Sequence, residues 1–312
     1  MTQLASRLVS ADSEIIDVGA NIGGTTNAFA QFVPRGQVVA IEPNRRLVKE
    51  IRQSRKKYGF KNIKTIRRAA FSKDFKILKL FVDDSTFSSS SSIYRGAGTT
   101  RFQLVRSLKI DSMRLQKLGL IKIDVEGAEF DVLVGAEQTI INFQPWIIFE
   151  ILVPTPGTEN NPMNLLEEKN YSFLNVNTLL RTSYPELLQS PGVFNILAIP
   201  GGKALETERQ FCRIIGLGEV CTLEKGIYVV EVSIQGIEPC VQGIGLFNLT
   251  ESCWEIYYET NIVNLKHQTN STLPIYLENQ TNLEIRFGLD CGHNHFLGAS
   301  LFKVFLEFPS NS

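Results

Sequence analysis

Three carboxylates gather within six positions, directly after an apolar stretch in the middle of the chain. They are Asp124, Glu126 and Glu129, and they follow a run that contains Leu118, Leu120, Ile121 and Ile123. Like charges held close together raise one another's pKa values, which suits a carboxylate that must take up a proton near neutral pH. The same oxygens could instead gather a hard divalent cation such as Mg²⁺ around a substrate oxygen. We therefore take Asp124 and Glu126 as candidate catalytic residues and leave the metal ligands unassigned.

A simpler explanation competes for part of this cluster. Glu126 and Glu129 fall near the start of an expected helix, where acidic side chains stabilise the helix dipole by about 0.3–1 kcal/mol without any catalytic role. Glu150 closes the next apolar run, "IIFE", and is the third catalytic candidate; its alternative role is a buried charge paired with an arginine. The first 200 residues contain no histidine, which is the usual general base, so this part of the chain must use carboxylates, a metal, or a nearby Lys or Tyr. Asp124 is the first residue to test.

A glycine-rich turn near the N-terminus predicts a nucleoside-cofactor site. The stretch "IIDVGANIGG" places Asp17 at the end of a buried strand, followed by Gly19, Gly23 and a helix whose first N–H groups can bind a ligand. The next strand ends at Glu42, where a carboxylate can accept both hydroxyls of a ribose. The spacing D-x-G-x-x-x-G is expected of S-adenosylmethionine enzymes and differs from the G-x-G-x-x-G fingerprint of NAD-linked dehydrogenases.

Three sequence blocks resemble the signature of a known family. "IIDVGANIGG", "VVAIEPN" and "LIKIDVEGAEFDVLVGAE" are similar in order and spacing to those of the FkbM-type methyltransferases, a branch of the class I S-adenosylmethionine-dependent enzymes. The resemblance covers roughly residues 12–200 and implies S-adenosyl-L-methionine as the cofactor. It also implies that Asp17, Gly19, Asn21 and Gly23 line the methionine part, that Glu42 binds the ribose, and that the turn containing Arg68 and Ala69 contacts the adenine.

The resemblance and one absent motif together narrow the acceptor. Enzymes that methylate the amino groups of nucleic-acid bases usually carry a D/N-P-P-Y/F signature after the fourth strand, and this chain has "DVEG" there. We therefore expect an O-methyltransferase that acts on a hydroxyl of a sugar, a glycan or a related small hydroxylated metabolite, with no nucleic-acid partner. A second class of function stays open, namely a glycan-binding protein whose methyltransferase-like domain is inactive. The serine stretch Ser88–Ser92 could form a flap that faces the acceptor, or a plain solvated loop.

The elements that position these residues alternate between strands and helices over the first 200 residues. Short apolar runs predict buried strands, among them 14–18, 37–42, 62–68, 145–151 and 193–199. Helical spacing predicts Thr25–Phe32, Asn44–Tyr58 and one helix after Asp124 that carries Phe130 through Ile141. This alternation implies an α/β fold, a Rossmann-like, doubly wound sheet of the class I methyltransferase type.

The pattern changes after "IPGGK" at residues 199–203. Period-2 alternation in "IYVVEVSI", "WEIYYE", "LEIRFGL" and "FKVFLEF" predicts an antiparallel β-sandwich, which we describe as jelly-roll-like. We therefore expect two domains, a methyltransferase domain at 1–202 and an accessory domain at 203–312. The accessory domain suits either glycan recognition or formation of a homo-oligomer.

Composition sets outer limits on partners and location. The formal net charge is +0 and 43% of the residues are hydrophobic, as in ordinary globular proteins. The sequence has no apolar run long enough for a membrane span and no signal-peptide core, and its five cysteines are not closely paired, so we expect a cytoplasmic protein with reduced thiols. Residues 45–79 nevertheless contain 14 Lys and Arg against two acids. This segment is either a solvated basic face or a docking surface for an anionic partner.

Overall fold

The structure is a computed structural model of the whole chain. It describes side chains over residues 1–82, 92–94, 101–153, 160–189 and 192–203, and the backbone of the strands between 206 and 307. The chain divides into two compact units, one built from Met1–Val176 and Arg181–Ala204, the other from Asn177–Leu180 and Leu205–Glu307. The expected domain boundary at residues 202 and 203 stays a prediction.

An eight-stranded sheet forms the centre of the first unit. Its order is β11-β10-β12-β9-β8-β1-β2-β3. The strands are β1 (Glu14–Val18), β2 (Gln37–Ile41), β3 (Ile63–Ile66), β8 (Leu118–Ile123), β9 (Trp146–Val153), β10 (Tyr171–Asn175), β11 (Leu180–Thr182) and β12 (Gly192–Pro200). The pairings from β3 to β9 are parallel, whereas β12 runs antiparallel to both β9 and β10. The chain reverses its direction of travel across the sheet after β3 and returns beside β1, which is the switch point where doubly wound sheets bind ligands.

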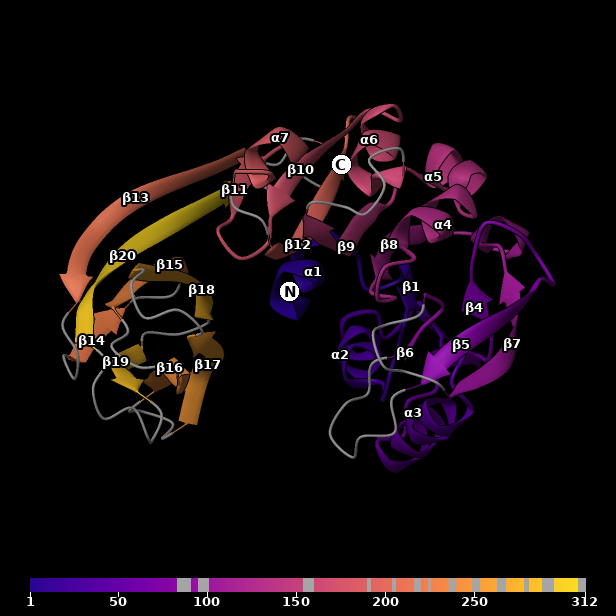
Figure 1. Cartoon of the computed structure of the whole chain (residues 1–312), viewed down its shortest axis with the longest axis horizontal. Coiled ribbons are helices and arrows are strands. Elements are labelled where there is room, and N and C mark those ends of the chain that lie inside the picture. Colours follow the sequence, from indigo (N-terminus) through magenta and orange to yellow (C-terminus); the bar gives the residue numbers. More distant parts are fainter. Residues whose placement is uncertain are drawn as a thin grey trace. The chain divides into compact units, whose positions relative to one another are not determined.

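Helices cover both faces of this sheet. They are α1 (Thr2–Leu8), α2 (Gly24–Phe32), α3 (Arg45–Lys57), α4 (Glu129–Val134), α5 (Glu137–Phe143), α6 (Pro162–Glu167) and α7 (Tyr184–Leu187), with a short 3₁₀ turn at Ile110–Ser112. Figure 1 shows α1 and α2 on one side of the strands and α4 to α6 on the other. Leu47, Val48 and Ile51 form the buried side of α3, as its helical spacing predicts, and the remaining sides carry charge. Among the described helices, none has the length and apolar character needed to cross a membrane.

The single helix expected after Asp124 is wrong, because the structure has two short helices there. The break falls at Gly135, which packs against the backbone of Phe71. A Cβ on Gly135 would lie 2.1 Å from the Phe71 carbonyl oxygen. Asp111 then caps the second helix, since its Oδ1 accepts the backbone N–H of Thr139 at 2.8 Å. Apolar spacing alone could not reveal a break at a glycine that packs against backbone distant in sequence.

A small extra sheet follows β3. Its order is β4-β7-β5-β6, with bounds β4 (Ala69–Ala70), β5 (Ile77–Val82), β6 (Ser91–Ser92) and β7 (Phe102–Leu108). The strands β5 and β7 pair in antiparallel register from Ile77↔Arg106 to Phe81↔Phe102. This sheet carries one wall of the cavity described below.

The second unit contains two antiparallel four-stranded sheets. Their orders are β13-β20-β15-β18 and β14-β19-β16-β17. The bounds are β13 (Glu206–Ile215), β14 (Val220–Leu223), β15 (Gly226–Gln235), β16 (Cys240–Asn248), β17 (Cys253–Ile262), β18 (Gln268–Leu277), β19 (Thr281–Phe287) and β20 (His295–Glu307). The expected jelly-roll-like fold of this unit stays a prediction. Face-to-face packing of the two sheets into a β-sandwich stays a prediction.

Candidate active site

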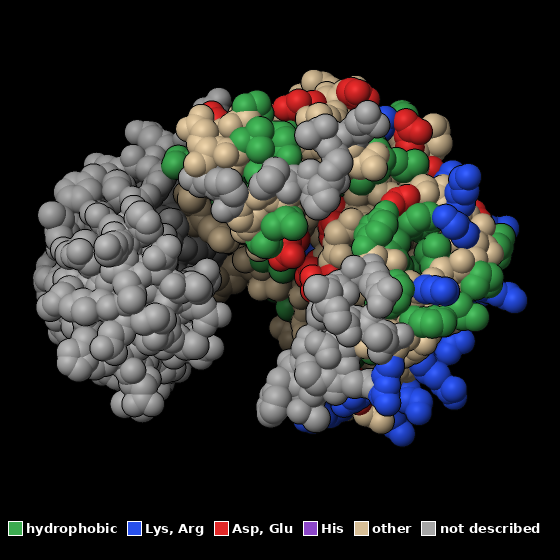
Figure 2. Space-filling view, viewed as in Figure 1, with side chains coloured by type: hydrophobic (Ala, Val, Ile, Leu, Met, Phe, Trp, Pro, Cys, Tyr) green, Lys and Arg blue, Asp and Glu red, His purple; other side chains and the backbone are tan. Residues whose placement is uncertain are grey.

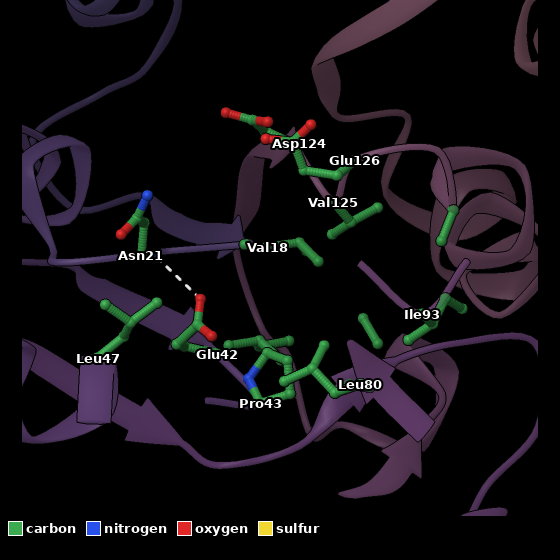
Figure 3. A pocket seen from close by; sticks show the side chains of 15 residues that line it. Val18, Asn21, Glu42, Pro43, Leu47, Leu80, Ile93, Asp124, Val125 and Glu126 are labelled. Carbon is green, nitrogen blue, oxygen red and sulfur yellow. Dashed lines mark hydrogen bonds between the residues drawn. The ribbon is translucent and has the colours of Figure 1, made fainter. Parts of the chain in front are cut away.

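A cavity opens at the carboxyl ends of β1, β2 and β8. The space between its walls measures about 650 Å³, including the part that is open to solvent. Its apolar lining consists mainly of Val18, Ile41, Leu47, Leu80, Ile93 and Val125. Figure 3 shows that its acids come from two places, with Glu42 on one side and Asp124 and Glu126 on the other. This is the position at which an open α/β sheet receives its ligand.

Glu42 is a buried carboxylate that the backbone holds in place. Its Oε2 accepts the N–H of Asn21 at 2.9 Å and its Oε1 accepts the N–H of Asn44 at 2.8 Å. Only 4% of the residue is exposed, and burial raises its pKa to about 7, against the lowering effect of these two hydrogen bonds. Each oxygen keeps a further lone pair for a ligand. Glu42 can therefore accept hydrogen bonds from the hydroxyl groups of a ligand inside the cavity.

Gly19 lets the ends of β1 and β8 meet. Its φ is +73°, and a Cβ there would lie 1.8 Å from the carbonyl oxygen of Asp124. Asn21 follows with φ +50° and also lines the cavity. No larger residue fits at position 19, so this glycine brings the cofactor turn and the acidic loop into contact.

Asp17 lies behind the cavity wall, in an ion pair that the sequence analysis missed. Its Oδ1 is 3.5 Å from Lys122 Nζ, and its Oδ2 accepts the hydroxyl of Thr26 at 2.5 Å. Lys122 Nζ also lies 3.2 Å from Asp124 Oδ2. Burial lowers the pKa of Lys122, but the charges of Asp17 and Asp124 outweigh this effect and raise it. A lysine inside the otherwise apolar run "LIKI" was the available signal, because a buried charge needs a partner.

Two further carboxylates interact electrostatically with Asp124, and only the first of them lines the cavity. Glu126 lies exposed at the rim with a left-handed φ of +58°, and partial desolvation together with the charge of Asp124 raises its pKa. Glu150 is half-buried in β9. Burial raises its pKa to about 7, and the charges of Asp124, Glu126 and Glu129 add to this shift. The arginine partner considered for Glu150 is not found among the described residues, where Lys122 is the cation that lowers its pKa.

Glu129 closes the loop that precedes α4. Its Oε1 accepts the backbone N–H groups of Val125 and Gly127, at 3.1 and 3.2 Å. Only 7% of the residue is exposed. These contacts fix the loop before α4, and the side chain accepts none of the N–H groups of the first helical turn.

The predicted site residues divide into two groups. Those that line the cavity are Gly19, Asn21, Glu42, Ala69, Asp124 and Glu126. Those that lie outside the set of described lining residues are Asp17, Gly23, Arg68 and Glu150. Gly23 instead forms the N-cap of α2 with φ +90°, and Arg68 donates to the carbonyl of its neighbour Arg67. The catalytic and cofactor-binding roles of all ten residues stay predictions.

A second cavity with an empty volume of about 990 Å³ lies beside the first. Consecutive residues line different cavities, because Ile93 lines the first cavity and Tyr94 lines the second. Burial and the charge of Asp131 raise the pKa of Tyr94 to about 12, and its hydroxyl donates to Asp131 Oδ2 at 2.6 Å. Tyr94 is therefore a neutral hydrogen-bond donor at neutral pH and no base. The serine flap lies mostly outside the described residues, although Ser92 donates to the carbonyl of Glu126 at 2.7 Å.

The acidic cluster does not form an evident metal site. Within the described ranges, no group of three or more His, Cys, Asp or Glu side chains is arranged to hold a metal ion. Glu126 lies in a left-handed turn, and Glu129 is held by the backbone N–H of Val125, so these two carboxylates do not converge. The suggested Mg²⁺ therefore finds no ready set of ligands in this part of the chain.

Comparison with solved structures finds methyltransferases at low similarity. One is an FkbM methyltransferase from Methylobacillus flagellatus KT, at 18% identity and a TM-score of 0.41, which aligns over 61% of this chain and 44% of its own. A precorrin-6y C5,15-methyltransferase from Geobacter metallireducens GS-15 gives 14% identity, a TM-score of 0.37 and coverage of 63% and 85%. A SAM-dependent methyltransferase from Aquifex aeolicus gives 12% identity and a TM-score of 0.35, with coverage of 63% of this chain and 87% of its own. This chain thus spans less than half the length of the FkbM structure.

The family assignment rests on a direct match of the sequence. None of the curated proteins compared matches the chain. A family model described as the methyltransferase FkbM domain matches residues 17–181, which is more than half of the 312 residues. The match begins at Asp17 and includes both strand ends that supply the acids of the cavity. The chain therefore belongs to the FkbM methyltransferase family.

Proposed function

We propose that the first domain transfers the methyl group of S-adenosyl-L-methionine to a hydroxyl oxygen of a sugar, a glycan or a related small hydroxylated metabolite. One observation carries the choice of a hydroxyl acceptor. Burial and three neighbouring acids raise the pKa of Glu150 to about 7, which suits a base that takes a proton near neutral pH.

The first cavity fits the proposed cofactor. Glu42 offers two fixed carboxylate oxygens to the hydroxyls of a ribose, and Leu80, Ile93 and Ala69 offer an apolar surface to an adenine ring. The acids on the opposite side, Asp124 and Glu126, suit a positively charged sulfonium. The bound cofactor supplies a methyl group on a good leaving group, so the protein mainly has to align the acceptor and exclude water.

The second cavity is the natural place for the body of the acceptor. Phe130, Ile151 and Pro162 give it apolar walls, while Tyr94 and Asn160 give it hydrogen-bonding groups. Such a mixture matches a sugar ring, which has apolar C–H surfaces and polar edges. An acceptor held there would bring one hydroxyl toward Asp124 and Glu126, and Glu150 on the neighbouring strand β9 would take the proton of that hydroxyl. S-adenosyl-L-methionine would supply the methyl group to the oxygen and would leave as S-adenosylhomocysteine.

Ion pairing favours Glu150 over Asp124 as this base. Asp124 is already engaged in an ion pair with Lys122, at 3.2 Å, whereas no described cation lies in an ion pair with Glu150. Asp124 then serves to hold Lys122 and to shape the rim of the cavity. The acidic rim also favours a neutral acceptor over an anionic one at the reaction centre.

Methyl transfer from labelled S-adenosyl-L-methionine tests the proposal directly. We would incubate the full chain with neutral sugars, glycans and nucleotide-sugars, with Glu150→Gln as the matched variant and with chelator in a parallel series. We expect transfer to a neutral hydroxylated acceptor that the variant loses and the chelator leaves unchanged. Transfer to an amino group, or to anionic acceptors alone, would contradict the proposal. If S-adenosylhomocysteine releases no heat on titration, the domain is inactive and a glycan-binding protein is the better description.

A further inference from the structure

The strands β5 and β7 expose an apolar and basic face that no other described element covers. We call it the hairpin face. It consists of Ile77, Lys79 and Phe81 on β5 and of Phe102, Leu104 and Arg106 on β7, which alternation and register place on the same side. Ile77 is 55% exposed, Phe102 47% and Leu104 66%. Antiparallel sheets normally turn polar residues to water, so an outer face dominated by large apolar side chains indicates a binding surface.

The opposite face of the same strands is a normal interior. Leu80 alternates with the hairpin-face residues on β5, is 1% exposed and lines the cofactor cavity. Ser107 on β7 is likewise buried. Packing inside the domain therefore already uses one face of the hairpin, and the other face remains available.

Positive charge surrounds the hairpin face. Of the 14 Lys and Arg residues between 45 and 79, only Arg68 is partly covered; the other 13 are exposed. Within the described residues, none of these cations forms an ion pair with an acid. Figure 2 shows Lys and Arg side chains gathered around apolar ones on this side of the domain, over β5, β7 and α3. Phe75, which is 72% exposed, adds to the apolar part.

We propose that the hairpin face docks on an anionic lipid bilayer. Aliphatic and aromatic side chains among Lys and Arg are the combination with which peripheral proteins enter the headgroup region of a charged membrane. The cations contact lipid phosphates while Ile77, Phe102 and Leu104 reach the acyl boundary. Docking of this kind needs no spanning segment and leaves the fold unchanged.

A nucleic acid fits the same surface less well. Bases bind exposed aromatic rings by stacking on their faces. Lys79 Nζ covers the ring of Phe102 at 4.8 Å from its centroid, and Phe81 meets that ring edge-on, with an interplanar angle of 62°. Leu104, which is more exposed than Ile77 and Phe102, offers no ring at all. These contacts favour insertion into lipid over stacking on bases.

Vesicle sedimentation of the full chain tests the proposal. We would compare vesicles of phosphatidylcholine and phosphatidylserine with vesicles of phosphatidylcholine alone, at low and high salt. We expect binding to the anionic vesicles only, weakened by salt. The double variant Ile77→Ser with Leu104→Ser should bind about tenfold more weakly, because it removes the side chains that enter the bilayer.

Matched controls separate this surface from general effects. Leu188→Ser with Val193→Ser changes two residues of similar exposure, 44% and 55%, far from the hairpin in sequence, and should leave vesicle binding unchanged. Lys79→Glu should weaken binding, whereas Arg114→Glu, at another exposed position, should not. Unchanged melting temperatures and S-adenosylhomocysteine affinities will show that the variants stay folded. Equal losses in the control variants, or binding of single-stranded RNA without binding of anionic vesicles, would overturn the proposal.

Discussion

Asp17 and Lys122 face each other across two neighbouring parallel strands, as register partners on β1 and β8. Asp17 Oδ1 lies 3.5 Å from Lys122 Nζ, and both residues are almost completely buried. Lys122 also pairs with Asp124 at 3.2 Å, which ties the motif before the glycine turn to the acidic loop after β8. Asp17 and Asp124, which lie far apart in sequence, are thus joined through one buried cation.

Removal of this cation should destabilise the fold. Lys122→Met leaves Asp17 buried without its charge partner, and a buried ion that loses its partner typically costs about 3–5 kcal/mol in the free energy of unfolding. Urea denaturation measures this loss. Lys117→Met breaks the exposed pair with Asp12 and should leave the free energy of unfolding nearly unchanged, because solvent screens that pair. Adding Asp17→Asn to Lys122→Met should restore part of the stability; equal effects of Lys122→Met and Lys117→Met would contradict the burial argument.

Cofactor affinity should depend on Glu42. Glu42→Ala removes the proposed ribose contact and leaves the N–H groups of Asn21 and Asn44 without their acceptor, at about 1–3 kcal/mol each. We expect the affinity for S-adenosylhomocysteine to fall by about tenfold or more, measured by isothermal titration. Glu50→Ala, at an exposed acid on α3, serves as control. An unchanged affinity in Glu42→Ala would rule out this carboxylate as the ribose ligand.

The same affinity should depend on pH. The pKa of Glu42 is raised to about 7, so near that pH the free protein carries a partly protonated carboxyl group. Hydroxyl donors bind best to the ionised form, and the affinity for S-adenosylhomocysteine should therefore rise as the pH increases through about 7. Titrations in buffers of different ionisation enthalpy will show the released proton. The test covers roughly one pH unit on either side of that pKa, from pH 6 to 8. An affinity that does not change over this range would contradict the prediction.

Glu150 should control the pH dependence of catalysis. A general base acts only when ionised, so kcat should rise through about pH 7, where the raised pKa of Glu150 lies. Glu150→Gln should lower kcat by about 10²- to 10⁴-fold and leave the affinity for S-adenosylhomocysteine unchanged. If this variant keeps the wild-type pH profile, the base is another group.

Stability offers an independent test of the same shift. The pKa of Glu150 is raised in the folded protein from its ordinary value of 4.5 to about 7. The native state therefore binds more protons than the unfolded state between these values, and the free energy of unfolding should fall as pH rises through this window. Glu150→Gln should make that fall shallower, as measured by urea denaturation across the range.

Gly19 should tolerate no side chain. A Cβ would lie 1.8 Å from the backbone oxygen of Asp124, and φ is +73°. Gly19→Ala should cost about 1–3 kcal/mol in stability and weaken cofactor binding, because the two strand ends must separate. Gly24→Ala is the matched control: no atom lies within 4 Å of its Cβ, and it begins α2. Thermal unfolding should place this control at or above the wild type.

The sequence by itself determined the elements and the place where the acids gather. Three kinds of feature depend on local chemistry and can be recognised without knowledge of the fold. They are apolar runs of strand length, the helical spacing of Leu47, Val48 and Ile51, and glycines directly after a strand. The carboxyl ends of parallel strands meet at one edge of a sheet. Asp124 and Glu42 were therefore predictable neighbours of one cavity, and the structure places both in its wall.

Only the tertiary structure decided what each acid does. It paired Asp17 and Asp124 with Lys122, gave Glu129 two backbone N–H groups, and left Glu150 beside three like charges. It also broke the helix at Gly135 against Phe71 and exposed Ile77 and Leu104 on the outer side of a hairpin. These outcomes depend on groups that are distant in sequence and close in space. The ionisation and contacts of a side chain follow from such neighbours, which no local pattern contains.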